Sequence, residues 1–502
     1  MKRITPDRPH ALHDIATTRR IEQRLQQSLP PHTLMQRAGR ASARLAQALA
    51  PHARTIWIAC GPGNNGGDGL EAAALLQQAG RPVWATHHAD PVRLPEDARA
   101  ALQRARDAGV RFGPPPAPGS LTAQDLAIDA LLGIGAAPDR ADAWLQQSLA
   151  ALAACGAPVL ALDIPSGLQA DAGTLNSKLI ANIPGHTWAR GIFHAQNTLS
   201  LLTLKPGLFT AQGRDMAGAV WFDDLGSSAQ HELPTAWLAG PATPEQRLHA
   251  SHKGSYGDVA VIGGEGLARA GRGMSGAALL AATAALHAGA GRVMLTLLNG
   301  NAGFSIDTAQ PELMLRHADA LDLRHGAVVC GCGGGDAVRS VLPRVLAEAA
   351  RLVLDADALN AIAADAQLRR QLVRRAAAGL PTVLTPHPLE AARLLGQTTA
   401  EVQADRLAAA RRLAQDCGCT VLLKGSGSIV AAPQQLPSIN PTGNARLATA
   451  GTGDVLAGMV GACLARGDEA FAAAVAASYR HGALADHWPA DVPLTAGALA
   501  RR

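Results

Sequence analysis

A loop that turns into an apolar helix carries the most chemically suggestive pattern of this sequence. Residues 449–458, TAGTGDVLAG, place two glycines just ahead of the carboxylate of Asp454. Glycine lets the backbone approach a phosphate closely, and the first free amides of a helix point at that phosphate. Asp454 then stands where a carboxylate could take the proton of a hydroxyl that attacks phosphorus. The same pattern also fits an ordinary glycine turn that is capped by aspartate.

A second candidate phosphate loop lies at 424–428, where KGSGS follows an apolar run. A lysine among closely spaced glycines suits the phosphates of a nucleotide. Residues 440–444, NPTGN, lead toward the first loop and could form the far wall of the same anion site. Two such loops and one carboxylate are what phosphoryl transfer needs, because that reaction depends on positioning and charge neutralisation. His387, between two prolines, is either a substrate contact or a structural residue.

The first half of the chain has its own glycine-rich loop at 61–69, GPGNNGGDG, which opens a helix after an apolar run. Its backbone amides can cradle a phosphate, and its asparagines can hold a hard cation or a ribose. The spacing is neither the dinucleotide fingerprint nor a P-loop. A turn with a capping asparagine is the alternative, although five glycines among nine residues exceed what a cap needs.

Polar side chains also end two later apolar runs of the first half. Asp129 and Asp163 could coordinate a cation, act as acid and base, or simply cap helices. The turn at 163–166, DIPS, holds Ser166 near Asp163. Lys205 could contact a phosphate or act as an acid, or it could be a solvated lysine.

Composition narrows the functional class. With 502 residues, 48% of them hydrophobic and 17% charged, the chain fits a globular protein of two to four domains. The net charge of +5 is spread along the chain, which does not favour nucleic-acid binding. Seven cysteines, with C-x-C pairs at 330/332 and 417/419, indicate free thiols and no zinc motif. We see no signal peptide or membrane span and expect a cytoplasmic protein.

Apolar runs that alternate with helical patterns predict two α/β domains with parallel sheets. In the first half the expected strands lie near 55–60, 81–88, 126–130 and 157–163, and a proline-containing linker covers 225–249. Ligands in such folds bind at the carboxyl ends of the strands. A doubly wound, Rossmann-like domain is therefore expected at 1–228, and a second α/β domain at 229–502.

The motifs together resemble one family, the bifunctional NAD(P)H-hydrate repair enzymes. The first half shows GPGNNGGDGL, DALLGIG and DIPSGL, and the second half shows HKGSYGDV, DADALN, TPHPLE, LKGSGS and GTGDVLAG. The resemblance implies an epimerase domain followed by an ADP-dependent dehydratase domain of ribokinase-like fold. Three stretches depart from the family. Cys332 stands where proline is usual, Leu389 stands where glycine is usual, and residues 176–193 do not match the family's pattern.

The resemblance implies roles for individual residues. Those expected to bind the hydrated coenzyme in the first domain are Asn64, Asn65, Gly66, Gly67, Asp68, Gly133, Ile134, Gly135, Ala136, Ala137, Pro138, Asp139 and Asp163. Potassium would be held by Asn65, Asp129 and Ser166. Asp163 would be the acid/base, with Lys205 a weaker candidate. In the second domain the hydrate would meet Ala277, Gly335, His387 and Asp454. The adenine nucleotide would lie on Lys424, Gly425, Ser426, Gly427, Ser428 and Gly453.

The implied second reaction consumes ADP with Mg²⁺. Asp454, as catalytic base, would deprotonate the ring hydroxyl, which attacks the terminal phosphate; the ester then eliminates to AMP, phosphate and the repaired coenzyme. NADHX, NADPHX and ADP are the expected small-molecule partners of an expected homo-oligomer. Two alternatives remain: a ribokinase-like kinase of a vitamin alcohol, and a first domain that only binds or serves as a scaffold.

Overall fold

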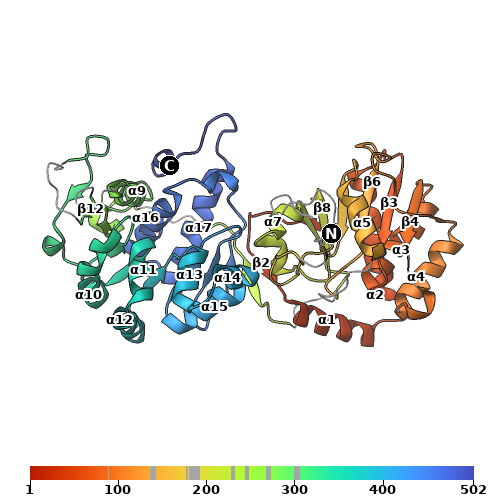
Figure 1. The fold of residues 1–502 in the computed structure, drawn as a ribbon, viewed down its shortest axis with the longest axis horizontal. Coiled ribbons are helices and arrows are strands. Elements are labelled where there is room, and N and C mark those ends of the chain that lie inside the picture. The colour runs from red at the N-terminus through yellow and green to blue at the C-terminus, as the bar shows by residue number, and fades with distance from the viewer. Residues whose placement is uncertain are drawn as a thin grey trace. The chain divides into compact units, whose positions relative to one another are not determined.

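The computed structural model describes residues 1–88, 90–135, 143–176, 179, 193–227, 232–243, 248–266, 273–298 and 306–502. They form two compact units (Figure 1). The first comprises residues 1–5 and 11–236, and the second comprises 6–10 and 237–502. We expected a boundary between 228 and 229 from motif order, and the exact functional limits stay a prediction. Within the described residues, no helix is long and apolar enough to cross a bilayer.

The first unit is built on a sheet of eight strands in the order β1-β9-β8-β7-β6-β3-β4-β5. All neighbours from β5 to β9 are parallel, and only β1 runs antiparallel. The strands are β1 (Lys2–Arg3), β3 (Ile56–Cys60), β4 (Val83–His87), β5 (Arg111–Phe112), β6 (Leu126–Ala130), β7 (Val159–Leu162), β8 (Asn197–Leu201) and β9 (Ala219–Asp223). The order reverses between β3 and β6, as in Rossmann-like sheets.

Helices cover both faces of this sheet, because alternate strand residues point to opposite sides. Ile56 and Ile58 pack with α2 (Thr33–Leu49), α3 (Asn64–Gln78) and α4 (Glu96–Asp107), whereas Trp57 packs with α5 (Ala143–Ala153). Among the described residues of the unit, the remaining helices are α1 (Ile15–Ser28) and α7 (Gly213–Met216). The first unit is therefore doubly wound, as predicted.

The second unit contains an eleven-stranded sheet in the order β13-β12-β11-β14-β15-β16-β17-β18-β19-β10-β2. The strands are β2 (His10–Leu12), β10 (Ala236–Leu238), β11 (Asp258–Gly263), β12 (Arg292–Leu297), β13 (Met314–Leu315), β14 (Ala327–Cys330), β15 (Arg351–Leu354), β16 (Thr382–Leu384), β17 (Thr420–Leu423), β18 (Ile429–Ala431) and β19 (Ser438–Ile439). Strands β11 to β17 are parallel, and β17, β18 and β19 pair antiparallel. The order reverses between β11 and β14.

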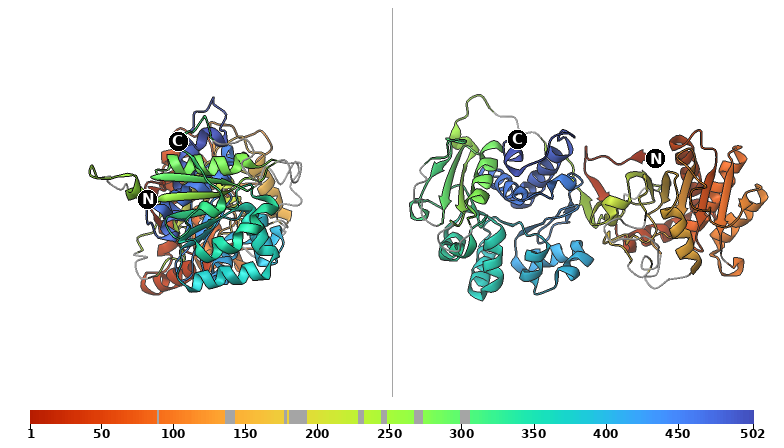
Figure 2. Two further views of the ribbon diagram at one scale, coloured as in Figure 1. Left: turned by 90° about the vertical axis from the view of Figure 1, so that its left-hand side faces the viewer. Right: turned by 45° about the horizontal axis from the view of Figure 1, so that its top comes forward.

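Two groups of helices enclose the parallel part of this sheet (Figures 1 and 2). One group is α9 (Ser275–His287), α16 (Thr452–Ala465), α17 (Ala470–Asp486) and α18 (Ala496–Leu499). The other group is α10 (Val338–Glu348), α11 (Ala356–Ala364), α12 (Ala366–Ala377), α13 (Pro388–Leu395), α14 (Thr399–Ala404) and α15 (Arg406–Cys417). Helix α16 packs very closely on α9: a Cβ on Gly458 would lie 2.1 Å from the carbonyl oxygen of Ala281. The many small residues of the sequence therefore allow close helix packing.

Candidate functional sites

A cavity of about 340 Å³ opens in the first unit at the point where the strand order reverses. The predicted residues that line it follow β3, β6, β7 and β8: Asn64, Asn65, Asp68, Gly133, Ile134, Gly135, Asp163 and Lys205. Gly66 and Gly67 lie in the first turn of α3 rather than on the cavity wall. Ala136, Ala137, Pro138 and Asp139 lie outside the described residues.

An ion pair holds the carboxylate of Asp163 in this cavity. Lys205 is fully buried, and its Nζ donates to Asp163 Oδ1 at 2.5 Å and to the carbonyl oxygen of Leu201 at 2.6 Å. The amide of Ile134 donates to Asp163 Oδ2 at 3.2 Å. Asp163 itself has a left-handed backbone with φ of 65°. Lys205 is thus not a solvated lysine. Its ion pair fixes the carboxylate of Asp163 at the carboxyl end of β7.

A second group of polar side chains surrounds the backbone of Leu132 and consists of Asp129, Ser166 and Asn65. Ser166 donates to Asp129 through its Oγ at 2.7 Å and its amide at 2.8 Å, and burial raises the pKa of Asp129 to about 6. Leu132 donates its amide to Ser166 Oγ and accepts from Asn65 Nδ2 at 3.0 Å. Asn65 Oδ1 is buried without a hydrogen-bond partner among the described residues. An unpaired amide oxygen beside a carboxylate and a hydroxyl is a donor set that suits a hard cation.

Two further carboxyl groups line the cavity, and their pKa values are raised. Burial raises the pKa of Asp68 well above its usual range, and the nearby Asp163 carboxylate adds to this. The pKa of Glu22 in α1 is also raised, first by burial and then by the negative charge of Asp163. Sequence reasoning missed Glu22, since the amphipathic pattern of α1 does not distinguish it from other charged residues. These two carboxyl groups therefore bind a proton more readily than exposed carboxyl groups do.

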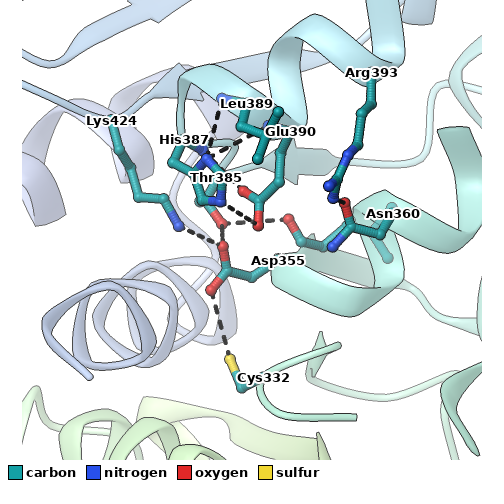
Figure 3. Close-up of polar contacts among 10 residues, drawn as sticks. Cys332, Asp355, Asn360, Thr385, His387, Leu389, Glu390, Arg393 and Lys424 are labelled. Atoms are coloured by element: carbon teal, nitrogen blue, oxygen red, sulfur yellow. Dashed lines mark hydrogen bonds and ion pairs between the residues drawn. The ribbon is translucent and has the colours of Figure 1, made fainter. Parts of the chain in front are cut away.

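The second site lies at the carboxyl ends of β14 to β17, and Asp355 is its centre (Figure 3). Asp355 Oδ1 accepts from Lys424 Nζ at 2.7 Å and from Thr385 Oγ1 at 2.8 Å. Its other oxygen faces Cys332 Sγ at 3.8 Å. Burial tends to lower the pKa of Lys424, but the carboxylates of Asp355 and Glu390 outweigh it and raise that pKa. Lys424 is therefore held as a cation, while sequence reasoning had left Asp355 without a role.

Asp454 faces the same centre from the first turn of α16. The helix begins at Thr452, and its cap residue is Gly451, whose φ is 90°. The capped-turn alternative therefore does not describe this loop, because Asp454 is not the cap. Burial, followed by repulsion from Asp355, raises the pKa of Asp454 to about 6, which suits a group that accepts a proton near neutral pH. Gly453 lies next to Lys424, since a Cβ on Gly453 would be 3.3 Å from Lys424 Nζ.

His387 serves as the N-cap of α13. Its Nδ1 accepts from the amides of Leu389 and Glu390, so its proton is on Nε2, which lies 3.2 Å from Glu390 Oε1 (Figure 3). Burial raises the pKa of Glu390 to about 7. Both ring nitrogens of His387 thus have protein partners, and its ring is left for contact with a ligand.

The remaining predicted residues lie on the surrounding loops. Gly335 donates its amide to Asp357 Oδ2 at 2.8 Å, and with φ of 52° any Cβ there would meet Glu265 Oε2 at 1.8 Å. Ala277 is buried in α9 and packs against the loop that contains Gly333, since a Cβ on Gly333 would lie 2.9 Å from the Cβ of Ala277. Gly425, Ser426, Gly427 and Ser428 form the turn between β17 and β18. The buried Arg406 lies beneath Gly425 and donates to the carbonyl oxygen of Lys424 at 3.3 Å.

These observations define a class of protein: a two-domain α/β chain with a Rossmann-like first unit and a phosphoryl-transfer type of site in the second. Residues 259–500 match the family described as NAD(P)H-hydrate dehydratase, and residues 31–207 match the YjeF-related protein N-terminus. The bifunctional NAD(P)H-hydrate repair enzyme of Escherichia coli is 35% identical over 477 residues, which cover 91% of this chain and 85% of that protein. The chain therefore belongs to the bifunctional NAD(P)H-hydrate repair enzyme family.

Other relatives match the second half alone. The ADP-dependent (S)-NAD(P)H-hydrate dehydratase of Neisseria meningitidis is 44% identical over 281 residues, covering 55% of this chain and 91% of that protein. A crystal structure of the ADP/ATP-dependent NAD(P)H-hydrate dehydratase from Bacillus subtilis, co-crystallised with ATP and Mg²⁺, is 29% identical and covers 51% of this chain and 91% of that chain, with a TM-score of 0.42. The predicted family is thus confirmed, and the mainly parallel sheet of the second unit confirms the predicted α/β class.

Proposed function

We propose that this chain repairs hydrated nicotinamide coenzymes. The first domain interconverts the R and S epimers of NAD(P)H-hydrate, and the second dehydrates the S form at the expense of ADP. The observation that carries the proposal is the group formed by Asp454, Lys424 and Asp355 at the helix N-terminus in the second unit. Family membership supplies the substrate and disfavours the vitamin-kinase alternative.

In the second domain Asp454 takes the proton of the ring hydroxyl, whose oxygen then attacks the terminal phosphate of ADP and releases AMP. The free amides at the start of α16 and the ammonium of Lys424 stabilise the charge that builds on the phosphate. The ring nitrogen's lone pair expels phosphate, and loss of a ring proton restores the double bond of the coenzyme.

Carboxylates beside the nucleotide loop fit a magnesium ion. Asp357 is a partly exposed oxygen donor near this loop, and the buried carboxyl group of Glu390 lies close to Lys424. Mg²⁺ usually takes one or two carboxylates together with substrate phosphates. When bound, Mg²⁺ neutralises phosphate charge. In the first domain Asn65, Asp129 and Ser166 fit potassium, since Asn65 Oδ1 is buried and unpaired among the described residues. When bound, this ion supplies positive charge beside the hydrate.

In the first domain Asp163 moves the proton that epimerisation requires. The hydroxyl of the hydrate lies on a carbon bonded to the ring nitrogen. Its C–O bond can therefore break when the hydroxyl receives a proton and leaves as water, and it can reform when water adds to the other face of the ring and loses a proton. Lys205 holds the carboxylate in place at 2.5 Å. Gly133 and Ile134 line the same wall, and the amide of Ile134 fixes the second oxygen of Asp163. We further propose a cytoplasmic homo-oligomer.

The test is recovery of near-ultraviolet NADH absorbance from a mixture of both epimers, with Mg²⁺, K⁺ and either ADP or ATP. Rapid, complete recovery with ADP supports both activities. Recovery that stops at the S fraction leaves an active dehydratase and a first domain that only binds. No recovery with either nucleotide contradicts the proposal and favours a vitamin-alcohol kinase, which would form a stable phosphate ester.

A further inference from the structure

Cys332 lies between two carboxylates of the second site. Its side chain is fully buried, and its Sγ is 3.8 Å from Asp355 Oδ2 (Figure 3). The carboxylate of Asp454 lies within 4.8 Å of both groups. One sulfur and two oxygens from these residues all lie within 4.8 Å of one another. In the described part of the chain, this is the one group of three or more such residues with metal-ligand spacing.

The spacing suits a tetrahedral zinc ion. With Zn–S near ~2.3 Å and Zn–O near ~2.1 Å, the ligand atoms of such an ion are roughly 3.5 Å apart. The 3.8 Å between Cys332 Sγ and Asp355 Oδ2 is close to this value, and the ligand atoms of all three residues lie within 4.8 Å of one another. Small side-chain rotations therefore complete three ligands and leave a fourth position open.

The surrounding groups prepare Asp355 for this role. Lys424 and Thr385 both donate to Oδ1 of Asp355, which turns Oδ2 toward Cys332. Such outer partners orient the ligands of metal sites. Charge also balances, because one thiolate and two carboxylates are offset by the Lys424 ammonium and a divalent cation.

We propose that Cys332, Asp355 and Asp454 form an inhibitory site for Zn²⁺ or a cation of similar softness. The thiolate favours Zn²⁺ over Mg²⁺, because Mg²⁺ prefers oxygen ligands alone. Binding releases the thiol proton and occupies Asp454. The inhibition rests on the proposed function, since it requires Asp454 to act as the base; the binding of the cation does not.

Cobalt(II) tests the site without substrate. The chelator-treated full-length chain should bind one Co²⁺ with a near-ultraviolet thiolate charge-transfer band, and Zn²⁺ should displace it. Cys332→Ala should lose the band, whereas Cys330→Ala should keep it, because Cys330 is equally buried two residues earlier but lies outside the group. Thermal unfolding of both variants confirms that they are folded. Absence of the band in the parent chain, or its survival in Cys332→Ala, would overturn the site.

Activity supplies the second measurement. With Mg²⁺ and ADP in excess, micromolar Zn²⁺ should inhibit dehydration of the S epimer by the parent chain and by Cys330→Ala. Cys332→Ala should need at least ten times more Zn²⁺ for the same fractional inhibition. Equal inhibition of all three proteins would refute an inhibitory role. If the parent chain has no dehydratase activity, the Co²⁺ titration still decides whether the site exists.

Discussion

The Nζ of Lys205 lies 2.5 Å from Oδ1 of Asp163, and this pair joins β8 to the end of β7 beneath the cavity of the first unit. Lys205 is fully buried, so its charge has little access to water. A buried charge is tolerated only when it is paired and hydrogen-bonded. The pair therefore fixes the orientation of the carboxylate that faces the substrate.

Replacing Asp163 should separate the two activities. Asp163→Asn keeps a residue that tolerates φ of 65° but cannot take a proton, so epimerisation should fall by about 10²–10⁴-fold. Dehydration of pure S hydrate should be unchanged, which provides the control within one protein. Proton exchange kinetics or chiral separation of the epimers measures the first rate. If Asp163→Asn epimerises normally, the first domain is a binding module and Asp163 is not the acid/base.

Replacing Asp454 should abolish dehydration and leave epimerisation intact. Asp454→Asn removes the carboxylate that accepts the proton of the hydroxyl, and dehydration should fall by about 10²–10⁴-fold. Epimerisation should persist, and thermal unfolding should show an intact second domain, since Asp454 does not cap α16. Near-wild-type turnover in absorbance recovery would exclude Asp454 as the base.

Lys424 should contribute to stability as well as to nucleotide binding. Lys424→Met leaves the carboxylate of Asp355, which is 1% exposed, without its ion partner, and the second domain should lose about 3–5 kcal/mol in the free energy of unfolding. Adding Asp355→Asn should restore most of this stability but none of the activity. Chemical denaturation of both variants is the measurement. If the single variant is as stable as the parent chain, the ion pair contributes nothing to folding.

His481 should make the second domain sensitive to acid. Burial lowers the pKa of His481 to about 4, and its Nε2 donates to the carbonyl oxygen of Thr452 at 3.0 Å. Between pH 6.5 and 4 the unfolded chain binds a proton that the folded chain does not, so stability is present above pH 6.5 and is lost as pH falls toward 4. The loss should reach about 3 kcal/mol. His481→Asn should flatten this dependence in denaturation curves measured across that range, and an unchanged slope would contradict the assignment.

Much of this arrangement was predictable from local sequence. Apolar runs that end in polar residues predicted β3, β6 and β7 and placed Asn65, Asp129 and Asp163 at one edge of a sheet. That prediction worked because buried parallel strands are continuous apolar segments and their carboxyl ends lie together.

Contacts between distant segments were not predictable in the same way. Cys332 and Asp355 are 23 residues apart and meet because β14 pairs with β15, which local patterning does not encode. Glu22 reaches the cavity from a helix whose charged face looks like any solvated face. Residues 6–10 belong to the second unit although the residues on either side of them belong to the first, and no local pattern in the sequence indicates this.

The left-handed backbone of Asp163 shapes how this protein can lose a function over generations. A single base change converts an aspartate codon to one for asparagine or glycine, and both residues accept φ of 65° readily. Such a change removes the proton-transferring carboxylate without straining the backbone, but it leaves the fully buried Lys205 without its counter-ion. Loss of this function is therefore coupled to a loss of stability in the first unit, so that protein quality control and selection on the repair reaction act on the same codon.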